Sequence, residues 1–107
     1  MSTMRNSVML IGHPTAPVMN SEEKQASFKL AVADKENGCV YTFDCVALDD
    51  VSKRVVRQVK EGVMTAIEGS LRNHDYTDRE GYTHTHTEVV ICDVLPLENH
   101  KVKEAAQ

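Results

Sequence analysis

Two histidines and a glutamate alternate with threonines late in the chain, in the segment T-H-T-H-T-E at positions 83–88. Residues two apart on a β-strand point to the same side, so His84, His86 and Glu88 could share a metal ion. His74 could face them from a neighbouring strand. A catalytic metal normally needs a further ligand and a pocket. We therefore predict a polar surface and no metal site, with added positive charge below about pH 6.5.

The other candidates for acid–base or nucleophilic chemistry lack partners. Glu68 has no second carboxylate or nucleophile at a spacing that would join it in catalysis. Ser70 lacks the flanking glycines of a nucleophile elbow, and the chain has no glycine-rich phosphate loop. We predict that the protein is not an enzyme and has no catalytic residues and no cofactor. A metal-dependent β-barrel enzyme that uses His84, His86 and Glu88 is the minor alternative.

Length and composition indicate an ordinary globular protein. The 107 residues suffice for one domain, and 41% hydrophobic with 26% charged residues is typical of that class. No apolar run approaches the roughly 18 residues of a membrane span, and the first residues lack a secretory signal. Three cysteines without C-x-x-C spacing favour reduced core residues over disulfides or zinc ligands, namely Cys39, Cys45 and Cys92. We predict a cytoplasmic protein without a membrane partner.

The charge balance limits how the chain could bind nucleic acid. Twelve basic residues face 16 acidic ones, for a net charge of −4, whereas nucleic-acid binders usually carry a basic footprint. Any phosphate contact must therefore come from a local patch. We expect modest salt sensitivity for the same reason.

Residues 63–76 form the longest alternating segment, which predicts one long strand. Alternation divides it into an inward face with Val63, Thr65, Ile67 and Leu71 and an outward face with Met64, Glu68, Arg72, His74 and Tyr76. Gly69 interrupts the inward face, as a bend or a close backbone approach requires. Aliphatic residues inward and Arg, His and Tyr outward are typical of a binding surface.

Four further segments predict strands, at residues 6–12, 26–33, 39–48 and 82–97. The second and third are joined at Asn37-Gly38, the strongest short signal for a hairpin. The predicted inward side chains of 26–33 are Phe28, Leu30 and Val32. Residues 15–20 predict an irregular limb, because Pro14 and Pro17 forbid regular central pairing.

One helix is predicted between the third and fourth strands, at residues 51–60. Its apolar stripe consists of Val51, Val55, Val56 and Val59. Asp49 or Asp50 can cap its start, and Gly62 can end it as a glycine just past the last turn. Three strands, a helix and two strands are the arrangement of a five-stranded OB-fold barrel, an all-β fold. We predict that this domain spans residues 1–97 and that 98–107 form a polar tail.

Four segments resemble the bacterial single-stranded DNA-binding proteins. N-S-V-M-L-I-G at 6–12 is similar to the opening strand of that family, and A-S-F-K-L-A at 26–31 to its second strand. V-M-T-A-I-E-G-S-L-R at 63–72 is similar to its V-x-V-E-G-x-L-R block, and Y-T-H-T-H-T-E-V-V-I at 82–91 to its Y-x-T-E-V-V-V strand. The four segments occur in the family's order and span most of the chain.

The resemblance implies an OB fold that binds single-stranded DNA without strong sequence preference and supports replication, recombination or repair. It also implies a homodimer or homotetramer. The family's stacking aromatics correspond to Phe43 and Tyr76. Stacking tolerates any sequence because every base has a π-face, and each stacked base contributes roughly 1–3 kcal/mol.

The chain also departs from the family's pattern on the binding face. It has no tryptophan, which often occupies the stacking positions. A basic residue common after the third-strand aromatic is Cys45 here, and a further aromatic is Asp49. No linker with an acidic tip follows Leu97.

The remaining residues of the predicted interface follow from exposure and charge. Tyr41 and Tyr82 are expected to assist stacking, and Lys29, Arg72 and Arg79 to contact phosphates. His74, His84 and His86 are expected to add positive charge at low pH. The exposed edge and the Met9 and Ile11 face of the first strand are the predicted self-contact.

A second function class stays open on the sequence alone. The missing tail and the reduced aromatic face favour an OB-fold accessory protein of the replication or restart machinery that acts mainly through protein contacts. Replication proteins would then be its main partners.

Overall fold

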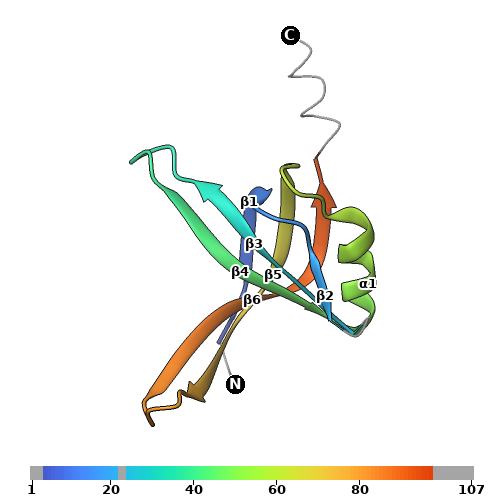
Figure 1. The fold of residues 1–107 in the computed structure, drawn as a ribbon. Helices are drawn as coiled ribbons and strands as arrows, with labels where there is room; N and C mark the ends of the chain where they lie inside the picture. The colour runs from blue at the N-terminus through green and yellow to red at the C-terminus, as the bar shows by residue number, and fades with distance from the viewer. Residues whose placement is uncertain (1–3, 22–23, 98–107) are drawn as a thin grey trace.

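The computed structural model describes residues 4–21 and 24–97 (Figure 1). The tail predicted for residues 98–107 lies outside these ranges. The elements follow in the order β1 (Val8–Pro14), β2 (Met19–Ser21), β3 (Gln25–Ala33), β4 (Val40–Leu48), α1 (Asp49–Gln58), β5 (Thr65–Thr77) and β6 (Thr83–Pro96). No helix in the described ranges has the length and apolar character needed to cross a membrane.

Five of the strands close into a barrel. β5 pairs antiparallel with β1 and β6, β6 pairs parallel with β4, and β4 pairs antiparallel with β3. The ring closes where the end of β1 pairs with β3. The short strand β2, in the segment predicted as an irregular limb, pairs with the start of β3. The prediction of a five-stranded OB-fold barrel with a helix between its third and fourth strands is confirmed.

Two glycines allow strands to approach closely. At Gly12 the partner of β1 changes from β5 to β3, and a Cβ atom there would lie 2.1 Å from the Ala31 carbonyl oxygen. Gly69 follows a bulge in the β5–β6 ladder, and a Cβ atom there would lie 2.0 Å from the Val90 carbonyl oxygen. Only a residue without a side chain fits at such distances. The prediction that Gly69 marks a bend or close approach is confirmed.

Aliphatic side chains from β3, β5, β6 and α1 fill the barrel. Leu30 on β3, Ile67 on β5 and Val55 on α1 are buried in it. Phe28 is buried as predicted, whereas Val32 is only partly buried and packs at the edge of the core.

The predicted inward position of Leu71 is wrong. Glu68 pairs with Asp93 but Gly69 pairs with Ile91, so the ladder shifts by one residue at this point. Beyond Gly69, β5 has lost its partner β1, whose ladder ends at Val8. Leu71 therefore lies beyond the β1–β5 ladder, where the Asn6 side chain bonds its backbone N–H and carbonyl, and 46% of its surface is exposed.

The helix covers one end of the barrel, but its ends differ from the prediction. Ser52, Val55 and Val59 face the barrel, whereas Val56 is exposed. β4 runs directly into α1, so Leu48 occupies the N-cap position and no side chain caps the helix. The proposed Asp49 or Asp50 cap is therefore wrong.

The end of the helix also lies earlier than predicted. Val59 is the C-cap residue, and its N–H donates to the Val55 carbonyl. Gly62 lies further along at φ 77°, where its N–H donates to the Pro14 carbonyl. Gly62 thus ties the connection to β1 and does not terminate the helix.

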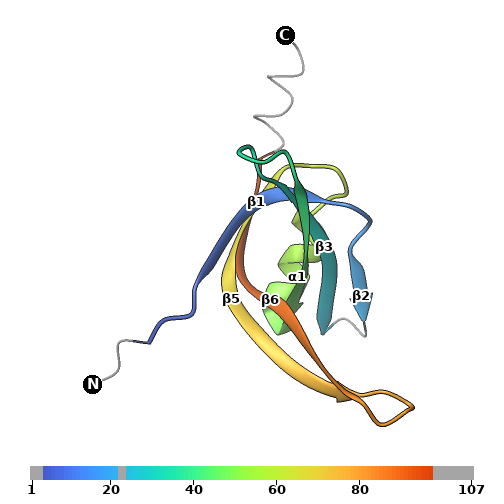
Figure 2. The ribbon, with the colours of Figure 1, turned by 90° about the vertical axis from the view of Figure 1, so that its left-hand side faces the viewer.

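Two hairpins extend from the barrel on the side away from α1, as Figures 1 and 2 show. One is the β3–β4 hairpin, whose Asn37-Gly38 turn confirms the hairpin prediction, with Gly38 at φ 75°. The other is the outer part of β5 and β6, residues 71–88, which we call the arm. These two hairpins carry nearly all residues predicted to bind nucleic acid.

Candidate nucleic-acid interface

One side of the arm carries three directly opposed pairs of polar side chains. The register places Tyr76 opposite His84, His74 opposite His86, and Arg72 opposite Glu88. Alternation places these six residues on one side, since each lies two residues from the next along its strand. The structure thus brings together five predicted binding residues and Glu88 in a single row.

The other side of the arm consists of short polar pairs. The Thr85 hydroxyl donates to Asp75 at 2.8 Å, and the Thr87 hydroxyl donates to Asn73 at 2.6 Å. Threonine pairs of this kind stabilise a two-stranded ladder that has no core beneath it. Thr85 and Thr87, which alternate with His84, His86 and Glu88, therefore help to hold the two strands of the arm together.

Tyr76 and His84 form a stacked pair near the tip of the arm. Their ring centroids lie 5.1 Å apart with an interplanar angle of 24°. Tyr76 is 52% exposed, in agreement with its predicted outward position. The His84 Nε2 atom lies 2.7 Å from an Asp78 carboxylate oxygen, which orients the imidazole beneath the tyrosine.

The turn at the tip of the arm is organised by Asp78. Its carboxylate accepts hydrogen bonds from the backbone N–H groups of Glu80 and Tyr82. The hydrogen bond with the His84 side chain has the largest effect in lowering the pKa of Asp78 below its usual value, and these backbone bonds lower it further. Arg79 and Tyr82 are exposed in this turn, and Arg79 has no ion pair with any residue in the described ranges.

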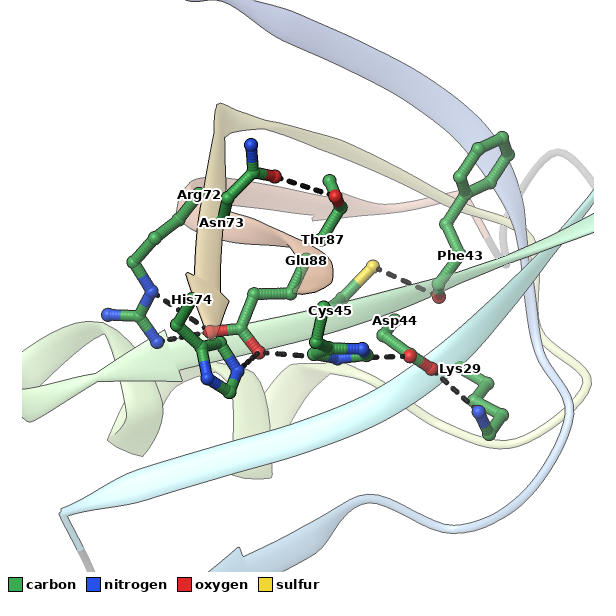
Figure 3. Close-up of polar contacts among 10 residues, drawn as sticks. Lys29, Phe43, Asp44, Cys45, Arg72, Asn73, His74, Thr87 and Glu88 are labelled. Carbon is green, nitrogen blue, oxygen red and sulfur yellow. Dashed lines mark hydrogen bonds and ion pairs between the residues drawn. The ribbon is translucent and has the colours of Figure 1, made fainter. Parts of the chain in front are cut away.

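Glu88 is the centre of a charged network at the base of the arm. Its side chain is only 12% exposed. Arg72 donates to its Oε2 atom through Nε at 2.9 Å and through a second guanidinium nitrogen. The Oε1 atom faces two imidazoles, with Nε2 of His86 at 3.8 Å and Nε2 of His74 at 4.0 Å (Figure 3).

The network continues across β4 to β3. The His86 Nε2 atom lies 3.3 Å from Oδ2 of Asp44, and Oδ1 of Asp44 lies 2.6 Å from Nζ of Lys29. Figure 3 shows this line of side chains running from Arg72 to Lys29. The charges of Lys29 and Arg72 and those of Asp44 and Glu88 sum to zero when the imidazoles are neutral. Lys29 and Arg72 are both exposed, but each is paired with a carboxylate.

Sequence reasoning missed Asp44 in this network, and it named Glu88 only beside the histidines and not as the partner of Arg72. The hairpin around Asn37-Gly38 sets the register that places Lys29 opposite Asp44. That pair could have been found by extending the hairpin register along both strands. The Arg72–Glu88 pair was not found, because its register is set at the tip of the arm, where Thr77 pairs with Thr83, and not by a two-residue turn such as Asn37-Gly38.

The aromatic residues of the β3–β4 hairpin lie apart from this row. Tyr41 is 46% exposed, and its hydroxyl accepts a hydrogen bond from the Asn37 side chain at 3.1 Å. Phe43 is partly buried and shares its side of β4 with Cys45, a core residue. Figure 3 shows Phe43 directed away from Asp44. Within the described residues, no contact joins Phe43 to Tyr76.

A shallow groove of about 380 Å³ lies beside the Lys29–Asp44 pair. The loop after β1 forms one wall with Thr15, Ala16 and Pro17. Lys29 and Asp44 also line the groove, together with His86 and Glu88. The groove has no sequence signal, since its walls come from segments far apart in the chain.

The histidines group differently from the predicted H-x-H-x-E pattern. The atoms within 4.8 Å of one another belong to His74, His86 and Glu88. His84 is engaged by Asp78 and Tyr76 instead. Directly opposed residues on paired strands lie closer together than residues two apart on one strand, which are almost 7 Å apart.

Two solved structures with a similar fold are single-stranded DNA-binding proteins. The mitochondrial protein of S. cerevisiae has a TM-score of 0.69 at 13% identity, covering 89% of this chain and 98% of that one. The small protein of Streptomyces coelicolor has a TM-score of 0.66 at 17% identity, covering 91% and 99%. At such identities these similarities establish the fold alone.

A curated relative shares more of the sequence. The single-stranded DNA-binding protein of Malacoplasma penetrans is 28% identical over 106 residues, which is 94% of this chain and 56% of that protein. The chain therefore spans little more than half the length of this relative.

A family model also matches almost the whole barrel and arm, over residues 5–97. Proteins of the matched family bind single-stranded DNA, typically form oligomers and are not enzymes, in agreement with the predicted absence of enzymatic activity. The chain belongs to the Single-strand binding protein family.

Proposed function

We propose that this protein binds single-stranded DNA without strong sequence preference, in the cytoplasm, in support of replication, recombination or repair. The observation that carries the proposal is the row on the arm, where a half-exposed Tyr76 continues into Arg72 and the histidines. An aromatic platform beside cations suits a strand whose bases stack and whose phosphates are charged. Family membership supports the same conclusion.

The strand follows the arm toward β3 in this proposal. Tyr76 stacks a base near the tip, with Tyr82 and Arg79 beside it in the exposed turn. Arg72 and Lys29 contact phosphates closer to the barrel. Phe43 and Tyr41 stack further bases on the β3–β4 hairpin, apart from the row on the arm.

The paired cations predict a weak dependence on salt. Lys29 and Arg72 contact Asp44 and Glu88, so a phosphate must compete with these carboxylates. Three phosphate contacts, at Lys29, Arg72 and Arg79, give a slope of about −2 for log K against log salt. His86 lies between Asp44 and Glu88, and His74 lies beside Glu88, so a positive charge on either imidazole would favour the strand.

We also propose a homodimer or homotetramer that uses the outer face of β1. Met9 is 68% exposed and Ile11 is 50% exposed. Ile11 aligns with Ala66 on β5, which aligns with the 61% exposed Leu95 on β6. A continuous apolar row across three strands is typical of a contact between subunits.

The second candidate function is an accessory protein that acts mainly through protein contacts. The same apolar row and the pairing of Lys29 and Arg72 with carboxylates favour it. Replication proteins would then occupy the exposed faces, and DNA affinity would be low.

Fluorescence anisotropy with a labelled oligo-dT of about 30 nucleotides separates the two functions. We expect binding at about 50 mM salt that weakens as salt rises. Tyr76→Ala should lower the affinity by about 5- to 150-fold, the value of one stacked base, whereas Tyr76→Phe keeps the ring and should bind nearly normally. No binding by the unmodified chain would reject the proposal and favour the accessory role.

A matched pair of arginines tests the position of the interface. Arg79 on the arm and Arg57 on α1 are both exposed and have no ion pair among the described residues. Arg79→Ala should reduce the salt slope by about 0.7, and Arg57→Ala should leave it unchanged. Equal effects of the two variants would place the strand elsewhere.

A further inference from the structure

Three potential metal ligands from two strands meet at the base of the arm. One ligand atom each from His74 on β5 and from His86 and Glu88 on β6 lies within 4.8 Å of the other two, and Nε2 of both histidines lies near Oε1 of Glu88. The two imidazole rings lie edge to face, with centroids 5.2 Å apart. Both ring nitrogens thus lie near the same carboxylate oxygen.

The glutamate is held in the orientation that a metal ligand requires. Arg72 donates to the Oε2 atom, which leaves Oε1 directed at the imidazoles. Only 12% of the Glu88 side chain is exposed, so the carboxylate is fixed between the strands. A hydrogen bond to the non-ligating part of a ligand is the usual way in which proteins position a metal site.

The distances suit a zinc ion after a small adjustment. Zinc bonds to imidazole and carboxylate of about 2.0–2.2 Å in a tetrahedron place ligand atoms about 3.4 Å apart. The two distances to Oε1 are 3.8 and 4.0 Å, and no pair among the three ligand atoms is more than 4.8 Å apart, so side-chain rotation must bring them closer together. Two histidines and a glutamate are an established zinc ligand set that leaves the fourth position open.

In contrast to the prediction from the sequence that no metal site is present, we propose that His74, His86 and Glu88 bind a divalent zinc ion on the strand-binding face. Asp44, whose Oδ2 atom lies 3.3 Å from Nε2 of His86, adds negative charge beside the ion. The open fourth position takes water or a phosphate oxygen. A bound ion adds two positive charges to a network whose charges otherwise cancel, so zinc should strengthen DNA binding; this consequence rests on the proposed function.

Zinc binding is measured first without DNA, by calorimetric titration of the metal-free chain with Zn²⁺. We expect one ion per chain. His74→Ala, His86→Ala and Glu88→Gln should each lower zinc affinity by at least about tenfold. His13→Ala, an exposed histidine on β1, controls for the general loss of an imidazole.

His84→Ala distinguishes the two possible sets of ligands. The cross-strand site predicts that its zinc affinity is unchanged, because His84 contacts Asp78 and Tyr76. Absence of zinc binding by the unmodified chain would overturn the proposal. So would affinity that falls in His84→Ala and survives in His74→Ala.

Imidazole resonances in an NMR titration avoid the risk that a variant misfolds. Zinc should shift the ring signals of His74 and His86 in the unmodified chain and leave those of His13 in place. Shifts confined to other histidines would contradict the site.

The DNA experiment is then repeated with and without zinc. We expect zinc to increase the affinity for oligo-dT in the unmodified chain and to have no effect in Glu88→Gln. Zinc binding without any DNA binding would keep the site and reject the proposed function. DNA binding without zinc binding would do the reverse.

Discussion

The inner and outer halves of the β5–β6 ladder have the same pairing but opposite surroundings. In the inner half, Thr65 and Ile67 are buried, and the strand is flanked by β1 and β6. In the arm, every β5 residue from Leu71 to Thr77 is exposed. Two chemically similar residues, Ile67 and Leu71, thus have entirely different environments on one strand.

The difference shows how this fold separates stability from binding. The barrel half is stabilised by burial, which strands on both sides and the helix provide. The arm is stabilised by cross-strand pairs such as Thr87–Asn73 and by the Asp78 turn. Its outward side chains are consequently free to bear charge and aromatic rings without any cost to a core.

The largest expected contrast is in thiol reactivity. Burial, with a smaller effect of Asp44, raises the pKa of Cys45 to about 12, whereas Cys39 and Cys92 are exposed. At pH 8 only about one Cys45 thiol in ten thousand is ionised, and thiolate is the reactive form. Titration with a disulfide reagent should show two fast thiols and one that reacts only on unfolding.

A double variant, Cys39→Ser with Cys92→Ser, isolates the slow thiol. If Cys45 reacts quickly in the folded double variant, the reagent reaches the barrel interior as easily as the surface. The contrast between the two regions then fails.

The next largest effect is on stability. Ile67→Ala should lower the free energy of unfolding by about 2–5 kcal/mol, because it opens a cavity in the barrel. Leu71→Ala on the same strand should cost less than about 1 kcal/mol, since Leu71 is 46% exposed. Urea denaturation measures both, and an equal loss would mean that Leu71 is covered in solution, for instance by a second subunit.

The smallest effect is the pH dependence of the arm. The folded pKa of Asp78 is lowered by His84 and by turn N–H groups, so its stabilisation is present above the ordinary value of 3.8 and is lost as pH falls through the lower folded value. An NMR titration of the Asp78 carboxyl carbon should give a midpoint below 3.8.

Asp78→Asn serves as the control for that titration. It keeps an oxygen that can accept from the turn N–H groups but removes the charge, so the Glu80 and Tyr82 N–H signals should lose the change that follows the titration of Asp78. A normal midpoint for Asp78 would show that the His84 contact does not persist in solution.

Pattern reasoning succeeded where local and global requirements agree. The Asn37-Gly38 hairpin, the close approach at Gly69 and the inward side of β3 follow from turn preferences and alternation, which short segments already express. It failed at Leu71 and at the helix cap, because a bulge and a direct strand-to-helix junction are decided by neighbouring strands.

The site shows the same division. The outward position of Tyr76 follows from alternation, and its exposure of 52% agrees. Alternation does not predict that His74, rather than His84, lies beside Glu88 with His86. That grouping depends on the cross-strand register. The pairing of Arg72 with Glu88 was missed for the same reason.

By itself, the sequence determined the order of strands and helix, the barrel, and the family motifs in residues 6–12 and 63–72. These properties depend on periodicity and on neighbours in the chain. Only the tertiary structure decided which charges meet, since Lys29, Asp44, His86 and Glu88 come from three strands and Arg72 from a fourth. Such contacts depend on register and curvature, which arise when the barrel closes.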